Sequence, residues 1–187
     1  FLPLQLLWLN LMTDGLLGLS MGVEPAERTV MARPPHHPQD SLWAGGLGRQ
    51  AAWVGTLIGL AALAVGFAYH ETDQPEWQTM IFTSIAFLQV FQAFATRSHR
   101  ESLSTIGWTT NRLMLAIAAF VVTLQLVAIY TPLRDFLDLE VLGFWDLMLC
   151  VGSGALLLVA LEAVKAVRRR SPAPAGRAVI GSWRRWR

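Results

Sequence analysis

Three side chains that carry oxygen atoms lie close together inside an apolar run near the start of this 187-residue sequence. Asn10, Thr13 and Asp14 are spaced i, i+3 and i+4, which places them on one face of a helix, within an arc of about 100°. A carboxylate in the core of a bilayer costs at least about 2.5–3.5 kcal/mol, so Asp14 is expected to face protein or a cavity. Carboxylate, amide and hydroxyl oxygens suit a hard cation such as calcium, whereas soft metals prefer Cys, Met or His. The spacing predicts a cation site; the alternative is hydrogen bonding between helices without an ion.

Three glycines, Gly15, Gly18 and Gly22, follow these side chains directly. Glycine allows a membrane helix to loosen, so that backbone carbonyls can also turn toward a bound ion where they line a cavity. The alternative is close helix packing, since Gly18 and Gly22 form a G-x-x-x-G pair. The two roles are compatible.

The composition indicates that these residues lie in a membrane protein. Apolar residues make up 53% of the chain and charged residues only 15%, against about 25% charged in an average globular protein. That is too little charge to cover the surface of a soluble domain of this size. The net charge of +2 gives no indication of nucleic-acid binding.

Several functional classes are excluded by the motifs. The single cysteine, Cys150, cannot form an internal disulfide, and there is no C-x-x-C pair for zinc. The Gly-rich phosphate-binding loops G-x-x-x-x-G-K-[ST] and G-x-G-x-x-G are also absent from the sequence. His36 and His37 are adjacent but have no further ligands nearby, which is typical of a solvated loop rather than a metal site.

Five apolar blocks, each close to the length of about 20 residues that crosses a bilayer core, would have to position the candidate site. Five such blocks in succession disfavour the alternative of buried helices in a large soluble protein. The sequence predicts an all-α fold, a polytopic transmembrane bundle with its C-terminus in the cytoplasm. The membrane domain is expected over residues 1–167, with spans at Phe1–Gly22, Leu42–Tyr69, Trp77–Thr96, Asn111–Tyr130 and Phe144–Val167.

The charges set the orientation of these spans. With five spans, fourteen of the 15 basic residues fall on one side, the exception being Arg134 in the fourth loop. The positive-inside rule makes that side cytoplasmic. Residues 168–187 form a basic cytoplasmic tail. Its Arg and Trp residues could contact anionic lipid headgroups, but a solvated tail that only fixes the topology is favoured.

Longer motifs resemble one family. Residues 5–15 read QLLWLNLMTDG, residues 22–27 read GVEPAE, and residues 31–35 read MARPP. This ordered set resembles the sixth transmembrane helix and the following cytoplasmic loop of P-type cation-transporting ATPases, in their calcium-pump branch. The other four spans are similar to helices seven to ten of that family in number, length and orientation. Because the sequence starts at Phe1, inside an apolar run, we expect that a larger protein precedes it.

The resemblance implies ligand roles for particular residues. Asn10, Thr13 and Asp14 stand where the family's sixth-helix ion ligands stand, and partner ligands would come from the fourth and fifth helices, outside this chain. Gln89 aligns with a Glu of the eighth helix in two-ion calcium pumps, and a neutral amide there suggests a single transported ion. The alternative for Gln89 is a polar contact between helices. The family often has a proline two residues after its Asp-Gly pair; the Leu17 found here leaves the helix break and strict calcium selectivity open.

The function implied by the resemblance is that of an ATP-driven pump, with calcium as the transported cation. The phosphorylated Asp and the domains that bind ATP and Mg²⁺ would lie upstream, so this fragment alone should be inactive as an enzyme and has no catalytic residues. Its partners would be the lipid bilayer and the upstream helices and cytoplasmic domains of the same pump, in a bacterial plasma membrane. The alternative is a non-catalytic membrane scaffold or accessory subunit derived from such a pump. A passive channel or secondary transporter is disfavoured because the chain has no internal repeat.

Overall fold

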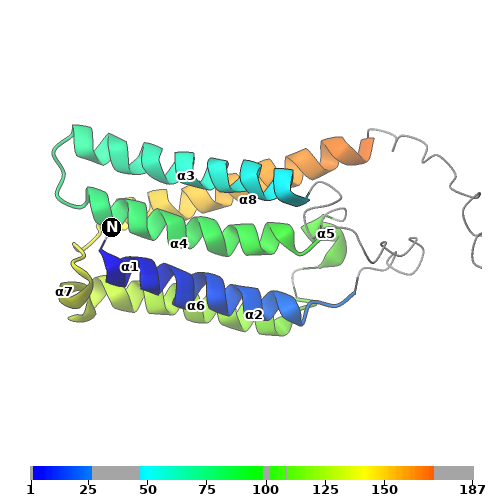
Figure 1. Cartoon of the computed structure of the whole chain (residues 1–187), viewed down its shortest axis with the longest axis horizontal. Coiled ribbons are helices and arrows are strands. Elements are labelled where there is room, and N and C mark those ends of the chain that lie inside the picture. Colours follow the sequence, from blue (N-terminus) through cyan, green and yellow to red (C-terminus); the bar gives the residue numbers. More distant parts are fainter. Residues whose placement is uncertain (1, 27–46, 99–101, 108, 171–187) are drawn as a thin grey trace, which may run out of the picture.

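The protein is an all-α bundle in a computed structural model that describes residues 2–26, 47–98, 102–107 and 109–170 (Figure 1). Every element within these ranges is a helix, which confirms the predicted fold class. His36 and His37, and the tail beyond Arg170, lie outside the described residues.

The described part of the chain contains nine helical segments. They are α1 (Pro3–Trp8), η1 (Leu9–Gly15), α2 (Leu16–Gly22), α3 (Leu47–Glu71), α4 (Trp77–Thr96), α5 (Leu103–Ile106), α6 (Arg112–Tyr130), α7 (Leu133–Leu137) and α8 (Phe144–Arg170). Four of them, α3, α4, α6 and α8, are single helices long and apolar enough to cross a membrane. The other predicted span consists of α1, η1 and α2, which follow one another without a break (Figure 1). We refer to these three segments together as the first span.

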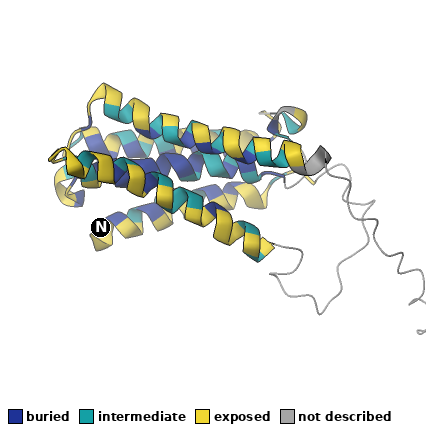
Figure 2. Cartoon of the chain, turned by 90° about the horizontal axis from the view of Figure 1, so that it is seen from above, coloured by how far each residue is buried: buried dark blue, intermediate teal, exposed yellow. Residues whose placement is uncertain are grey.

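Helix α4 lies at the centre of the bundle. On one side it contacts α3 and α8, and on the other it contacts η1, α2 and α6 (Figures 1 and 2). Leu88 packs in an apolar cluster with Leu157 of α8, whereas Phe82 packs in a second cluster with Leu9 of the first span and Ala128 of α6. Helices cover α4 on both sides, so 67% of its most apolar part is buried, and the polar side chains of Thr79, Thr83 and Ser84 are buried together with the apolar ones.

Two glycines allow the close approach of α4 to its neighbours. A Cβ added at Gly66 of α3 would lie 2.0 Å from the Cγ1 atom of Ile81. A Cβ at Gly154 of α8 would lie 2.4 Å from Cδ2 of Phe91 and 3.0 Å from the backbone oxygen of Phe87. Small residues are used in this way between membrane helices, where backbones must come close together to pack.

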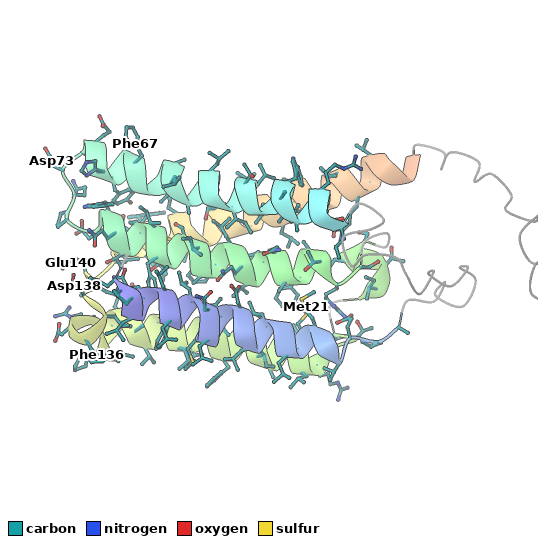
Figure 3. All side chains as sticks on the ribbon, viewed as in Figure 1. Met21, Phe67, Asp73, Phe136, Asp138 and Glu140 are labelled. Carbon is teal, nitrogen blue, oxygen red and sulfur yellow. The ribbon has the colours of Figure 1, made fainter. Side chains whose placement is uncertain are left out.

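The two ends of the bundle carry different charges. Asp73, Asp138 and Glu140 lie at one end, whereas Met21 lies toward the opposite end (Figure 3). Near Met21, Glu24 forms an ion pair with Arg97, just after the end of α4. Successive spans run in alternate directions through the bundle (Figure 1).

Candidate cation site

The three clustered candidate residues all lie in a π-helix. Segment η1 spans Leu9–Gly15 and so contains Asn10, Thr13 and Asp14. A π-helix has wider turns than an α-helix and appears mostly as a short insertion, frequently at functional sites. The sequence led us to expect a loosened helix at the glycines. The structure has an uninterrupted run of helix in which the turns around these residues are widened.

Burial separates the three side chains from one another. Thr13 is 1% exposed, while Asn10 and Asp14 are both exposed. The buried positions of the first span form one stripe along it, made up of Gln5, Leu9, Thr13, Leu17 and Ser20. Thr13 therefore faces the other helices of this chain, and Asn10 and Asp14 lie beside that stripe, on a side that these helices leave open.

The neighbours of Thr13 in the buried stripe of the first span show which part of α4 it lies beside. Leu9, four residues before Thr13, lies in the same apolar cluster as Phe82. Leu17, four residues after it, lies in the same cluster as Val90. Since residues four apart on a helix stack along one face, Thr13 lies level with the stretch of α4 between residues 82 and 90.

Gln89 falls within this part of α4. Its Oε1 atom is buried and accepts no hydrogen bond from the described residues, and the Thr13 Oγ1 atom is likewise buried without a partner among them. A buried polar atom without a partner costs free energy, so native proteins rarely leave one unpaired without a reason. The described residues therefore include two buried, unpaired oxygens, one on the first span and one on α4 within the stretch that lies level with it.

These groups do not form a complete cation site by themselves. No described residue donates a hydrogen bond to, or forms an ion pair with, the side chain of Asn10 or Asp14. In the part of the chain that the structure describes, no three His, Cys, Asp or Glu side chains are grouped so as to hold a metal ion. The arrangement can supply carboxylate, amide and hydroxyl oxygens to a hard cation, but further ligands would have to come from outside the described chain.

Two of the three glycines after Asp14, Gly18 and Gly22, also face open space. A Cβ added at Gly18 or Gly22 would meet nothing within 4 Å among the described residues. The G-x-x-x-G pair therefore makes no close contact with the helices of this chain, and it lies on the first span together with the exposed Asn10 and Asp14.

Residues that were not predicted from the sequence hold the first span in place. The Nε2 atom of Gln5 donates to the Leu137 carbonyl at 2.9 Å, after α7 has turned back toward the first span. Nε1 of Trp8 donates to Oε1 of Gln125 at 3.2 Å, and Nε2 of Gln125 donates to Oγ1 of Thr83 at 3.3 Å. An amide inside an apolar span, as at Gln125, is the signal that could have indicated such a link.

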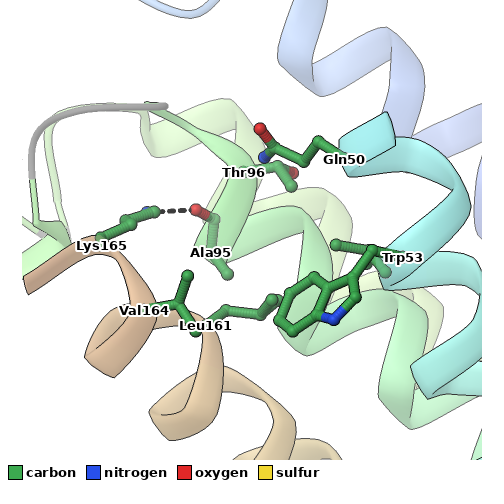
Figure 4. Close-up of a pocket in the computed structure, with 8 residues that line it drawn as sticks. Gln50, Trp53, Ala95, Thr96, Leu161, Val164 and Lys165 are labelled. Carbon is green, nitrogen blue, oxygen red and sulfur yellow. Dashed lines mark hydrogen bonds between the residues drawn. The ribbon is translucent and has the colours of Figure 1, made fainter. Parts of the chain in front are cut away.

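A small pocket lies elsewhere, on the other side of α4 from η1 (Figure 4). The pocket has a volume of about 20 Å³ and lies among α3, α4 and α8. Beside it, Lys165 donates a hydrogen bond to the Ala95 carbonyl. Lys165 also pairs with Glu162 at 2.8 Å. Neither Thr13 nor Gln89 lines this pocket, so it is separate from the candidate cation site.

Comparison with known proteins identifies the family. Residues 1–167 match the family described as "Cation transporting ATPase, C-terminus". The chain belongs to this family. It is an integral membrane protein, and the match confirms the resemblance to the C-terminal transmembrane region of calcium-pump-like ATPases.

Three similar proteins carry related names. The chain is 28% identical to "Calcium-transporting ATPase 1" of Lactococcus lactis over 90% of its own length and 19% of that protein. It is 31% identical to the "Calcium-transporting ATPase" of Bacillus subtilis over 82% of its own length and 18% of that protein. It is 29% identical to human "Calcium-transporting ATPase type 2C member 1", over 89% and 18% of the two chains. The chain thus spans about a fifth of the length of these relatives, whose names do not favour the alternative of a membrane scaffold.

Proposed function

We propose that this chain is the ion-binding C-terminal membrane portion of an ATP-driven pump that transports calcium. The similar proteins that carry related names are calcium-transporting ATPases from two bacteria and from human. ATP and Mg²⁺ would bind in other domains of the full-length protein, and a bacterial plasma membrane would be its location. The upstream helices and the cytoplasmic domains of the same protein would be its partners, in addition to the lipid bilayer.

In this proposal four side chains contribute ligands to the transported ion. Asp14 supplies negative charge, Asn10 and Gln89 supply amide oxygens, and Thr13 supplies its hydroxyl oxygen. The observation that carries the proposal is the pair of buried, unpaired oxygens, one at Thr13 in the π-helical segment that also holds Asn10 and Asp14, and one at Gln89 on α4. A bound cation would satisfy both oxygens and would compensate the carboxylate, which is costly in a bilayer without a partner.

The open side of the first span supports the assignment of the remaining ligands to the rest of the protein. Calcium takes 6–8 oxygen ligands in proteins, and these four side chains provide fewer. Asn10, Asp14 and Gly18 are all exposed along the same span. Upstream helices of the full-length protein would cover this side and complete the site. With Asp14 as the one carboxylate and a neutral amide at position 89, we expect a single calcium ion per cycle.

The decisive experiment is an Asp14→Asn substitution in the full-length protein. Even the loss of an outer partner of a metal ligand typically lowers metal affinity by about 10–100-fold, so removing the carboxylate should raise the half-saturating calcium concentration by at least that factor. Calcium uptake into membrane vesicles and calcium-dependent phosphorylation measure it. Asp135→Asn is the matched control, because the Asp135 side chain is 75% exposed and, among the described residues, pairs only with its neighbour Arg134. Unchanged calcium dependence in Asp14→Asn would refute the site.

A further inference from the structure

A buried ion pair fastens the end of the first span to the end of α4. Nε and Nη2 of Arg97 donate to Oε1 of Glu24 at 2.9 and 2.7 Å. The Arg97 side chain is only 1% exposed and that of Glu24 is 14% exposed. Glu24 follows α2, and Arg97 follows the last residue of α4. The pair therefore joins the helix that carries the three clustered candidate ligands to the helix that carries Gln89.

Asn111 extends this link to α6. Its Nδ2 atom donates to Oε2 of Glu24 at 2.7 Å and to the backbone oxygen of Ser20 at 3.0 Å. Its Oδ1 atom accepts from the backbone nitrogen of Met114 at 2.9 Å and so caps the N-terminus of α6. One side chain thereby fixes the start of α6 and the end of the first span, since an N-cap contact holds the helix start in one geometry.

The other donors of Arg97 hold the chain between α5 and α6. Nη1 donates to the Gly107 carbonyl at 2.9 Å, and Nη2 donates to Oγ1 of Thr110 at 2.6 Å. Both oxygens of the Glu24 carboxylate and all three nitrogens of the guanidinium are therefore hydrogen-bonded. A buried charge pair is tolerated when its remaining donors and acceptors are satisfied in this way.

We propose that Glu24, Arg97 and Asn111 form a clamp that positions the π-helical ligand segment against α4 and α6, and thereby sets calcium affinity. We define the clamp as these three side chains. It acts through position, since Glu24 follows Asp14 by ten residues, or about 15 Å along a helix. The idea rests on the proposed function, because it needs Asp14 and its neighbours to be the ligands.

The first span is fixed on both sides of the ligand segment. Trp8, the residue before η1, is held by Gln125, and the clamp holds the residues after α2. Between these two links Thr13 makes no side-chain hydrogen bond with the described residues. Loosening one link allows η1 to rotate or slide against α4, which shifts the ligand segment relative to Gln89. Groups that orient metal ligands typically influence metal affinity by about 10–100-fold.

The test uses the full-length protein with the variant Glu24→Gln. The half-saturating calcium concentration for phosphorylation should rise on the order of tenfold, with the maximal rate at saturating calcium changed less than twofold. Glu162→Gln is the matched control, because Glu162 lies at the same end of the bundle, where it pairs with Lys165 within α8 at 2.8 Å and accepts a hydrogen bond from Ser102, the residue before α5. It does not touch the first span, so it should lower thermal stability and leave the calcium dependence unchanged.

Two further variants keep the test decisive if the buried Arg97 charge prevents Glu24→Gln from folding. The double variant Glu24→Gln with Arg97→Gln removes both charges, and Arg97→Lys keeps the charge but loses the planar fork that reaches Gly107 and Thr110. Both should raise the half-saturating calcium concentration. The clamp is refuted if these variants stay within twofold of the unmodified protein while Asp14→Asn has lost calcium dependence. If Asp14→Asn also has no effect, the proposed function itself is wrong.

Discussion

The first span and α3 lie on opposite sides of α4, and both leave most of their surface uncovered, but what they expose differs. In the most apolar part of α3 only 17% of residues are buried, against 67% for the central α4. The exposed side of α3 is apolar, with Leu60, Leu63 and Phe67 each about 60% exposed. Its one exposed hydroxyl in mid-helix, Thr56, donates to the carbonyl of Ala52 in the same helix. The α3 surface is therefore suited to lipid as it stands.

The open side of the first span is not suited to lipid in the same way. It exposes leucines, but it also exposes Asn10 and Asp14, and neither has a partner among the described side chains. An intramembrane carboxylate almost always faces protein or a water-filled cavity. Exposure alone therefore does not identify a lipid-facing surface: an apolar open side faces lipid, while an open side with a carboxylate needs a protein partner or an ion.

The largest effect is expected from placing a carboxylate on the lipid-facing side of α3. Leu60→Asp exchanges a favourable residue for one that costs about 3 kcal/mol at a helix centre. We expect insertion of the 47–71 segment to fall accordingly, as measured with a glycosylation reporter in a host membrane protein. Thr56→Val, which removes a hydroxyl already bonded within the helix, is the control and should change insertion little. An equal loss in both variants would contradict a lipid-facing α3.

The reverse exchange, Asp14→Leu, should favour insertion of residues 1–22 in the same reporter by a similar amount. The full-length protein with this change should nevertheless lose calcium-dependent phosphorylation. Improved insertion with lost activity would show that the carboxylate is kept for function at a cost to the membrane segment. Retained activity would make the first span no different from α3.

A smaller effect is expected where α8 is packed against α4. Gly154→Ala puts a Cβ 2.4 Å from Phe91 and 3.0 Å from the backbone of Phe87, so α8 must move away. Overpacking of this kind costs about 1–3 kcal/mol, which should appear as a lower melting temperature of the full-length protein in detergent. Gly152→Ala is the control, since a Cβ there meets nothing within 4 Å in the described part. Equal melting temperatures would mean that the close approach of α4 and α8 contributes no stability.

The sequence predicted the all-α membrane bundle because this fold class depends on local composition. A run of about 20 apolar residues must cross the bilayer as a helix whatever its neighbours are. The clustering of Asn10, Thr13 and Asp14 was equally local, since it follows from spacing on a single helix. Whether these residues and Gln89 bind an ion stays a prediction.

What the sequence could not predict depends on contacts between distant segments. The turns of the helix are widened over Leu9–Gly15, and no residue pattern in the sequence predicted this π-helix. The burial of Thr13, but not of Asp14 beside it, depends on how the first span is rotated against α4. The pairing of Glu24 with Arg97 joins residues 73 apart, and hydropathy contains no information on such a pair.

The smallest effect should come from the polar link in the middle of the bundle, where the buried side of the first span is held. Gln125→Leu removes the acceptor of the Trp8 Nε1 atom and the donor to Thr83. Hydrogen bonds between membrane helices average about 0.6 kcal/mol each and reach about 1.7 kcal/mol at most, so the melting temperature should fall only slightly. Thr123→Val is the control, because Thr123 is exposed and donates within α6 to Ala119.

The same substitution, Gln125→Leu, also tests whether a contact on the buried side of the first span affects calcium binding on its open side. Loss of the Gln125 link frees Trp8, the residue just before η1. The half-saturating calcium concentration should therefore rise, even though the melting temperature falls only slightly. A fall in stability with unchanged calcium dependence would mean that only the clamp end fixes the ligand segment. An effect on calcium dependence alone would mean that the buried side of the first span positions ligands on its open side, although the two sides face different neighbours.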